Sequence, residues 1–271
     1  MTDRDDRLPS RMLIGRERLF YSGLVGNAMS TRRLGAVAVY ASPDSHLDIR
    51  VGDGPWQKRR IAAVPAFAPH RLRTPSGRIA TVCFEPETVD AADAAAFIGR
   101  INDGPGDGRL IRRILTARRE VTRGADAGGF STAEFDRYFL RERLKPRTID
   151  KRVRHVLARL LDELPDTAIS AEACAGAVGL STSRFLHLFK DEAGSSFRTQ
   201  RMWKRARRFM DHANGADSLT AVALGLGYPD SSHFSHTIRA AFGLKPRSIR
   251  EGSRGMRVCL GENYSRAGDD G

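Results

Sequence analysis

The sequence predicts an α+β protein whose N-terminal part is rich in strands and whose C-terminal part is entirely helical. Between residues 17 and 85, short β-rich runs are separated by clusters of Gly, Pro, Ser and Asp, a pattern typical of a small antiparallel barrel or sandwich. Beyond residue 86 the apolar residues recur with helical spacing. The 271 residues suffice for about two domains, each with its own core.

Five strands are expected in the N-terminal part, each bounded by residues that favour turns. The segment from Gly52 to Pro55, for example, combines two glycines with a proline and separates two β-rich runs. The expected strands are residues 19–25, 34–41, 47–51, 60–64 and 79–84. Such strands favour a small antiparallel β-barrel over residues 1–90.

The region after the strands is expected to be helical and to end at a domain boundary. Its expected helices are residues 89–101, 110–119 and 131–140, with a glycine-rich break at 124–129. The second of them carries one apolar stripe that could pair two chains in a homodimer, formed by Leu110, Ile111, Ile114 and Leu115. We place the boundary at Lys145-Pro146, because proline lacks the amide hydrogen that a helix interior needs.

A helix-turn-helix pattern follows this boundary. A helix with one apolar face is expected over residues 149–164, ending before Pro165. Ser170 can cap a helix over residues 171–178, and Ser181 can cap another that runs to about residue 192. Gly179 between them suits the left-handed residue of a tight turn. Two helices joined by a short glycine turn are typical of a DNA-reading unit.

The same pattern occurs a second time. Gly179, Phe185, Phe189 and Gly194 have counterparts 48 or 49 residues later in Gly227, Phe234, Ile238 and Gly243. In the second copy Ser218 caps a helix over residues 219–226 and Asp230 caps a helix that runs to Phe242. A connecting helix is expected over residues 197–213. Its candidate buried residues are Phe197, Met202, Phe209 and Met210, and its interleaved cations are Arg198, Arg201, Lys204, Arg205, Arg207 and Arg208.

These residues resemble the AraC/XylS family of bacterial transcription regulators, whose DNA-binding domain has two helix-turn-helix units joined by a long helix. The resemblance covers about residues 146–251, and its most specific stretch is residues 227–250, from the second turn to the closing helix. Residues 177–190 fit the first unit. Ile249 stands where the family commonly has an aromatic residue. The resemblance implies binding to double-stranded promoter DNA. RNA polymerase is a candidate partner, and a homodimer is the hypothesis drawn above from the stripe at residues 110–115.

The N-terminal part resembles the small cupin barrel that often precedes this domain, with residues 64–72 similar to a late-strand segment. Residues 1–150 contain only His46 and His70, and no HxH pair, so the ligands of a catalytic metal are too few. We therefore expect no metal, no cofactor and no enzyme activity. The barrel is interpreted as a sensor of an unknown small-molecule effector or as a relic. Candidate lining residues are Tyr21, Val39, Tyr40, Phe67 and Phe84.

The resemblance implies that the second helix of each unit enters the major groove with its outward side chains. In the first unit these are Thr182, Ser183, Leu186, His187 and Lys190, and in the second Ser231, Ser232, His233, Ser235 and His236. Hydroxyl and imidazole groups reach base edges, and a lysine suits phosphate. Leu186 has the alternative of packing against the connecting helix. Two interpretations are open for the cations of that helix: they form a solvated face, or they bind phosphates of the DNA backbone as a clamp.

Neither reading helix offers an outward arginine for guanine, unless Arg184 or Arg239 turns outward. Affinity is then expected to come mainly from phosphates. Two units in one chain predict direct half-sites about one helical turn, roughly 10 base pairs, apart. The four expected regions are a barrel over 1–90, a helical dimerisation and linker region over 91–145, the DNA-binding domain over 146–251, and a flexible tail over 252–271.

Charge and composition narrow the function classes further. The net charge of +13 favours a polyanionic partner. Three well-separated cysteines, Cys83, Cys174 and Cys259, are interpreted as free thiols, and without a signal peptide or membrane-spanning run we expect a cytoplasmic protein. Two alternatives remain: a cupin-type metal enzyme fused to a DNA-binding tail, which metal analysis would detect, and a nonspecific basic nucleic-acid-binding protein, whose affinity would follow charge alone.

Overall fold

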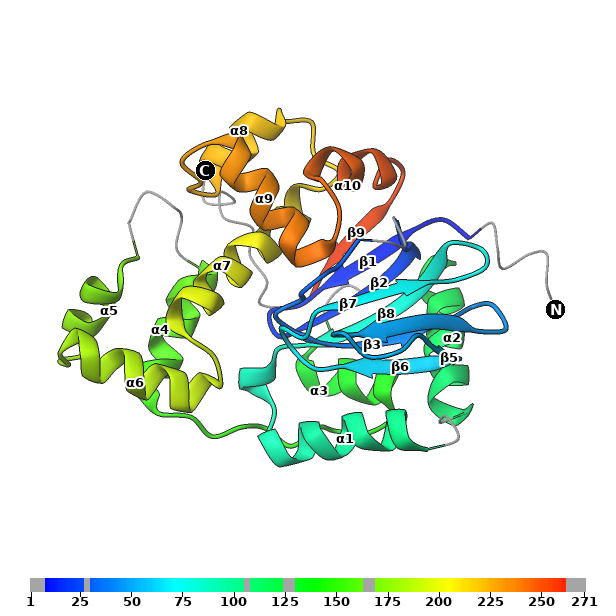
Figure 1. Ribbon diagram of the computed structural model, residues 1–271, viewed down its shortest axis with the longest axis horizontal. Coiled ribbons are helices and arrows are strands. Elements are labelled where there is room, and N and C mark those ends of the chain that lie inside the picture. Colours follow the sequence, from blue (N-terminus) through cyan, green and yellow to red (C-terminus); the bar gives the residue numbers. More distant parts are fainter. Residues whose placement is uncertain (1–7, 27–29, 105–107, 124–129, 163–168, 262–271) are drawn as a thin grey trace.

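The computed structural model describes residues 8–26, 30–104, 108–123, 130–162 and 169–261, and it has a sheet-rich N-terminal part and a helical C-terminal part (Figure 1). The strands are β1 Arg11–Ile14, β2 Arg18–Leu24, β3 Val37–Ala41, β4 Leu47–Val51, β5 Gln57–Arg59, β6 Ile61–Val64, β7 His70–Arg73, β8 Arg78–Phe84 and β9 Arg257–Leu260. The first helices are η1 Pro86–Thr88, α1 Ala91–Asp103, α2 Gly108–Thr122, α3 Thr132–Phe135 and η2 Asp136–Leu140. The helices of the C-terminal part are α4 Lys151–Asp162, α5 Ala171–Ala177, α6 Thr182–Ala193, α7 Phe197–Arg208, η3 Phe209–His212, α8 Leu219–Gly225, α9 Ser231–Phe242 and α10 Pro246–Gly252.

The strands form two open sheets, so the prediction of an α+β fold is confirmed and that of a closed barrel is wrong. The larger sheet has the order β6-β3-β8-β2-β1-β9, and the smaller has the order β5-β4-β7. At the β6 edge the side chain of Asn102 takes the place of a further strand. Its Oδ1 accepts from the Ala63 amide at 3.0 Å, and its Nδ2 donates to the Ala63 carbonyl at 2.7 Å. The amide and carbonyl of Ala63 are therefore satisfied without a neighbouring strand.

One face of the larger sheet is covered by the helices that follow it in the chain (Figure 1). Alternate strand residues such as Val39 and Val82 point into this layer, where they pack with α1, α2 and η2. The stripe expected to pair two chains lies here: Leu110, Ile111 and Ile114 are buried and Leu115 is partly buried in the same cluster. The stripe therefore packs on the chain's own sheet, and the hypothesis that it forms a dimer is contradicted.

The other face of the larger sheet packs against the smaller sheet and against the second helix-turn-helix unit. Tyr40, Ile79 and Cys83 share one apolar cluster with Trp203 of α7 and Phe234 of α9. Contact is close at Gly35, where an added Cβ would lie 2.2 Å from Cγ of Trp203. A glycine before β3 thus allows the indole ring to lie directly on the sheet.

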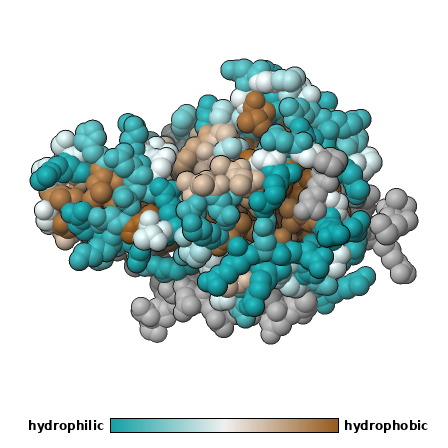
Figure 2. Space-filling model, turned by 90° about the horizontal axis from the view of Figure 1, so that it is seen from below, coloured by the Kyte–Doolittle hydropathy of each residue, from teal (hydrophilic) through white to brown (hydrophobic). Residues whose placement is uncertain are grey.

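The first helix-turn-helix unit has a core of its own. Val153 and Leu157 of α4, Cys174 of α5 and Phe185 and Phe189 of α6 form a separate buried cluster. The rings of Phe185 and Phe189 each lie 5.4 Å from the ring of Phe197 at the start of α7. This lobe projects to one side of the molecule (Figure 1), and its surface seen from below is mostly hydrophilic around small apolar patches (Figure 2).

The end of the described chain returns to the N-terminal sheet. Residues Arg257–Leu260 form β9, which pairs in parallel with β1, Arg257 opposite Arg11 and Leu260 opposite Ile14. The expectation of a flexible tail from residue 252 is therefore wrong for this strand, because its amides and carbonyls join the sheet ladder. Residues 262–271 lie outside the described residues, as do the expected helix end at Pro165 and the glycine-rich break at 124–129.

Local predictions agree closely with the helices of the C-terminal part. Ser170, Ser181, Ser218 and Asp230 each accept a hydrogen bond from the amide three residues later, as expected of caps. In the connecting segment, α7 ends at Arg208 and continues as the 3-10 turn η3. Phe197, Phe209 and Met210 are buried as expected, whereas Met202 is 39% exposed and Trp203 takes its place in the core. Across the described residues, none of the helices is both long and apolar enough to cross a bilayer.

Candidate nucleic-acid interface

The two helix-turn-helix units have the same local construction. In each, a short first helix, α5 or α8, meets the second helix, α6 or α9, through a turn that contains one glycine. Gly179 has φ 68° and Gly227 has φ 72°, so both occupy the left-handed region that other residues rarely adopt. Each second helix also ends at a left-handed glycine, Gly194 or Gly243, whose amide donates to the carbonyl four residues earlier. The repeat in the sequence is therefore a repeat in the structure.

The inward residues of α6 and α9 fix which face each helix presents to solvent. Phe185 and Phe189 are at most 1% exposed, and so are their counterparts Phe234 and Ile238. These pairs lie one helical turn apart and anchor one side of the helix in its core. The opposite side is left free in both units.

The outward residues predicted from the sequence lie on these free sides. In α6, Ser183, Leu186, His187 and Lys190 are exposed and Thr182 is half-buried; in α9, Ser231, Ser232, His233 and His236 are exposed and Ser235 is half-buried. Leu186 is 39% exposed, so it is not buried against the connecting helix. The accessibility of both surfaces in the whole chain meets the first requirement for contact with a base.

Each helix also presents an arginine to solvent. The sequence did not decide whether these two arginines turn outward. Arg184 lies beside Ser183 on α6, Arg239 lies on the last turn of α9, and both are exposed. Arg184 is near the start of its helix, where groove-reading side chains of such units commonly lie. Helical spacing alone did not identify these two residues, because they lie at the border between the outward face and the flank.

The cations of α7 do not form one phosphate-binding face. Arg198 is exposed, but Lys204 and Arg207 are 1% and 2% exposed and point toward the N-terminal sheet. Arg205 lies over the ring of Tyr228, 5.3 Å from its centroid, and Arg201 donates to the Ile169 carbonyl. A clamp of all six cations is therefore excluded.

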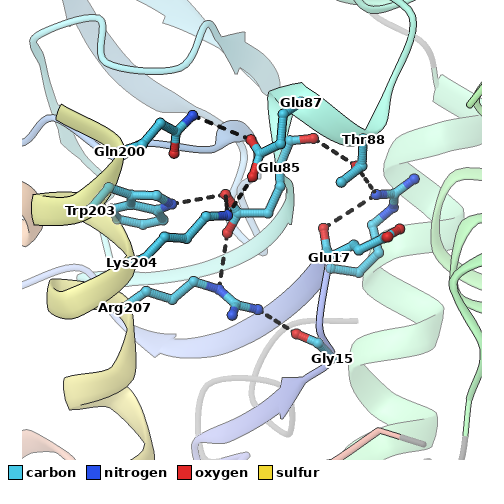
Figure 3. A network of polar contacts seen from close by, with 10 residues as sticks. Gly15, Glu17, Glu85, Glu87, Thr88, Gln200, Trp203, Lys204 and Arg207 are labelled. Carbon is cyan, nitrogen blue, oxygen red and sulfur yellow. Dashed lines mark hydrogen bonds and ion pairs between the residues drawn. The ribbon is translucent and has the colours of Figure 1, made fainter. Parts of the chain in front are cut away.

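Lys204 and Arg207 belong instead to a buried polar network that joins α7 to the end of β8 (Figure 3). The Glu85 carboxylate lies 2.9 Å from Lys204 Nζ and 3.1 Å from Arg207 Nε, and it accepts from Trp203 Nε1 at 2.9 Å. Glu87 in η1 is the second carboxylate on Lys204. Burial alone lowers the pKa of Lys204, but Glu85 and Glu87 outweigh it and raise that pKa above its ordinary value. The lysine is therefore charged, and the two parts of the chain are joined by ion pairs.

The N-terminal part offers no group of metal ligands in the described residues. Nowhere in that part of the chain do three His, Cys, Asp or Glu residues gather as a metal site would require. His70 is buried, and its Nε2 lies 2.7 Å from the Tyr40 hydroxyl while its Nδ1 bonds the Ala68 carbonyl. Both nitrogens thus have protein partners. Cys83, Cys174 and Cys259 are not joined to one another by disulfides.

Of the candidate lining residues, Tyr21 and Tyr40 border a cavity of about 410 Å³ between the larger sheet and the second unit. Phe84 also borders this cavity, although its ring belongs to the core on the opposite face. Val39 packs in that core, and Phe67 packs at the edge of the sheet cluster. The cavity has helices α7, α9 and α10 as one wall. It therefore lies between the two parts of the chain instead of inside a barrel.

Comparison with known proteins agrees with this architecture. Residues 174–252 match a family described as a helix-turn-helix domain. The HTH-type transcriptional activator RhaS of Escherichia fergusonii is 30% identical over 154 residues, which cover 52% of this chain and 54% of that protein. The arabinose operon regulatory protein of Escherichia coli K12 is 25% identical over 194 residues, which cover 67% of this chain and 59% of that protein. The chain thus spans little more than half the length of these curated relatives.

A solved structure extends the likeness to the sheet-rich part. ToxT from Vibrio cholerae O395 aligns with 87% of this chain and 98% of its own, with a TM-score of 0.54 and 9% sequence identity. Such a low identity shows a shared fold. The arrangement of an N-terminal sheet followed by two helix-turn-helix units is therefore common to both proteins.

Proposed function

We propose that this chain, a member of the AraC/XylS family of transcription regulators, binds promoter DNA with both helix-turn-helix units and activates transcription in response to a small molecule. The observation that carries the proposal is that α6 and α9 keep their polar faces exposed in the full chain. The sheet packs against the opposite side of the second unit, where Phe234 and Ile238 are buried. Neither reading surface therefore has to be uncovered before DNA binds.

The proposed contacts divide into base and phosphate contacts. Ser183, Leu186 and His187 of α6 would read bases in one major groove, and Ser232, His233 and His236 of α9 would read the next. Asp230 supports the second set, since its Oδ1 accepts from the His233 amide at 2.7 Å and fixes the first turn of α9. Thr182, Lys190, Ser231 and Ser235 would contact the backbone. Half-sites would then be direct and about one helical turn, roughly 10 base pairs, apart.

The exposed arginines add a contact that can select guanine. Arg184 and Arg239 each carry a planar guanidinium, which pairs with guanine O6 and N7 through two hydrogen bonds. We include them among the proposed DNA contacts. RNA polymerase is the proposed protein partner of the bound regulator, as the resemblance implies for an activator.

The test is footprinting of the full chain on genomic fragments, followed by the variants His187→Ala and His236→Ala. A lost base contact is worth about 1–3 kcal/mol, so each variant should lose about tenfold in discrimination at one half of the site. Folding should be unchanged because both side chains are exposed. His155→Ala, an exposed histidine on α4, is the matched control and should leave the footprint unaltered.

Two outcomes would overturn the proposal. If both variants protect the parent sequence with the same discrimination, α6 and α9 do not read it. If competitor DNA of unrelated sequence abolishes every footprint, the chain is a nonspecific basic binder whose affinity follows charge.

A further inference from the structure

A second cavity lies beside α2, in the helical layer on the face of the larger sheet away from the second helix-turn-helix unit (Figure 1). Its volume is about 200 Å³. Its described lining consists of four arginines and one threonine: Arg109, Arg112, Arg113, Thr116 and Arg141. No described carboxylate belongs to this lining. We call it the arginine cavity, and it is separate from both reading helices.

Two segments of the chain bring these arginines together. Positions 109, 112, 113 and 116 of α2 are three or four residues apart, the spacing that places side chains on one face of a helix. Arg141 comes from the turn that follows η2, and its φ of 62° lies in the left-handed region. The cavity is therefore formed by the fold and is not a run of neighbouring cations in the sequence.

Arg113 is held in place by groups outside the lining. Its Cζ lies 4.1 Å from the centroid of the Tyr138 ring, and its Nε donates to the Tyr138 carbonyl. Its Nη2 lies 3.1 Å from the Glu120 carboxylate, and the side chain is only 19% exposed. Thr116 Oγ1 accepts from Arg119 at 3.2 Å, so its own hydrogen can be donated to a ligand. One side of the cavity is thus positioned before a ligand binds.

The other side carries positive charge that is not compensated within the described residues. Arg112 and Arg141 are exposed, and no described carboxylate pairs with either. Other exposed arginines of the N-terminal part are paired, Arg100 with Glu142 at 2.7 Å and Arg73 with Asp48 at 3.0 Å. The first turn of α2 also contains no acidic residue, although the helix dipole favours negative charge there. An anion in the cavity would reduce the repulsion between the arginines and interact favourably with the dipole.

We propose that the arginine cavity binds a polyphosphate group, a short chain of linked phosphates. A guanidinium pairs with phosphate oxygens through two parallel hydrogen bonds, so arginines from two segments suit several adjacent phosphates. The cavity of about 200 Å³ is several times larger than the roughly 30 Å³ that a water molecule takes in the liquid, so it holds more than a single small ion. Inorganic polyphosphate and nucleotides both carry this group. The inference goes beyond the proposed function and does not depend on it.

The experiment titrates the full chain with sodium tripolyphosphate in a calorimeter, at about 0.15 M salt, where exposed charges are screened beyond about 8 Å. We expect saturable binding. Arg112→Gln and Arg141→Gln should each weaken it about tenfold, because each removes a charge-assisted hydrogen bond. Both side chains are exposed, so folding should be unchanged. Arg60→Gln removes an exposed arginine outside the lining and is the matched control, with an expected change of less than about twofold.

Measurements on the unmodified chain test the class of ligand. Citrate, which has three carboxylates and no phosphate, should bind about tenfold more weakly than tripolyphosphate because it carries less charge. Tighter binding of a nucleoside triphosphate than of tripolyphosphate would support the proposal with a nucleotide as the source, and the reverse order would support it with inorganic polyphosphate.

Four outcomes would overturn the inference. Three are no saturable binding of tripolyphosphate, equal binding of citrate, and equal effects of Arg112→Gln and Arg60→Gln. The fourth is a loss of affinity for unrelated duplex DNA in Arg112→Gln as large as its loss for tripolyphosphate, because the arginines would then belong to a DNA-binding surface. The titrations with tripolyphosphate contain no DNA, so a failed footprint leaves their result standing.

Discussion

The two helix-turn-helix units are alike in local construction and different in their surroundings. The first has a separate core, formed by α4, α5, α6 and the start of α7. The second shares one apolar cluster with the N-terminal sheet, and the ion pairs of Lys204 and Arg207 hold α7 against the same sheet (Figure 3). Changes in the sheet should therefore reach α9 through a shared core, whereas α6 has a separate core and meets the N-terminal part at η1. The second unit is the part of the helix-turn-helix region that shares a core with the N-terminal sheet.

Removal of the buried lysine Lys204 should produce the largest difference in stability between the two units. Lys204→Met leaves Glu85 and Glu87 buried without their shared cation, so the free energy of unfolding should fall by about 3–5 kcal/mol. Urea denaturation measures the loss. Hydrogen exchange should show lower protection in α9 and β8 and little change in α5. Arg198→Met, an exposed site on the same helix, should stay within about 0.5 kcal/mol of the parent. Equal losses of hydrogen-exchange protection in α5 and α9 would show that the two units depend equally on the sheet.

A methyl group at Gly35 should loosen the contact between the sheet and α7. In Gly35→Ala the new Cβ would lie 2.2 Å from the Trp203 ring, so the ring must move. Such overpacking costs about 1–3 kcal/mol. Trp203 is 7% exposed, and its emission should shift to longer wavelength as it meets water. Gly225→Ala on α8, where an added Cβ meets nothing within 4 Å, is the control, and a shift of the same size there would contradict the assignment.

Acid should lower the stability of the N-terminal sheet, together with the second unit that shares its core, more than that of the first unit. Burial lowers the pKa of His70 to about 4, from 6.5 in the unfolded chain. Between these values the unfolded chain binds a proton that the folded chain excludes, so stability falls as the pH falls from about 6.5 to 4, by up to about 1.4 kcal/mol per unit. His70→Gln should flatten this slope in urea denaturation at several pH values. His155→Gln, exposed on α4, should leave it unchanged; a slope that persists in His70→Gln would exclude this histidine as the cause.

The sequence was most informative where structure depends on residues close together in the chain. The caps at Ser181 and Asp230, the left-handed turns at Gly179 and Gly227, and the outward faces of α6 and α9 follow from helical spacing and local hydrogen bonds. All five expected strand segments contain a strand. The strands that were not expected, β1, β5, β7 and β9, are three or four residues long and carry charged residues, so alternation over so short a run gives little signal.

Tertiary structure decided which charged residues of α7 meet solvent. Helical spacing treats Arg198, Lys204 and Arg207 alike, but the last two are buried because Glu85, more than one hundred residues earlier, lies opposite them. The hydrogen bonds of Asn102 to the sheet edge and the pairing of β9 with β1 also join residues that are far apart in the sequence. The sequence by itself determined two helix-turn-helix units, because their turns and caps are encoded within a few residues. Only the folded chain determined that one unit is joined to the sheet and that a cavity lies between them, because these features require contacts between segments that the sequence does not place together.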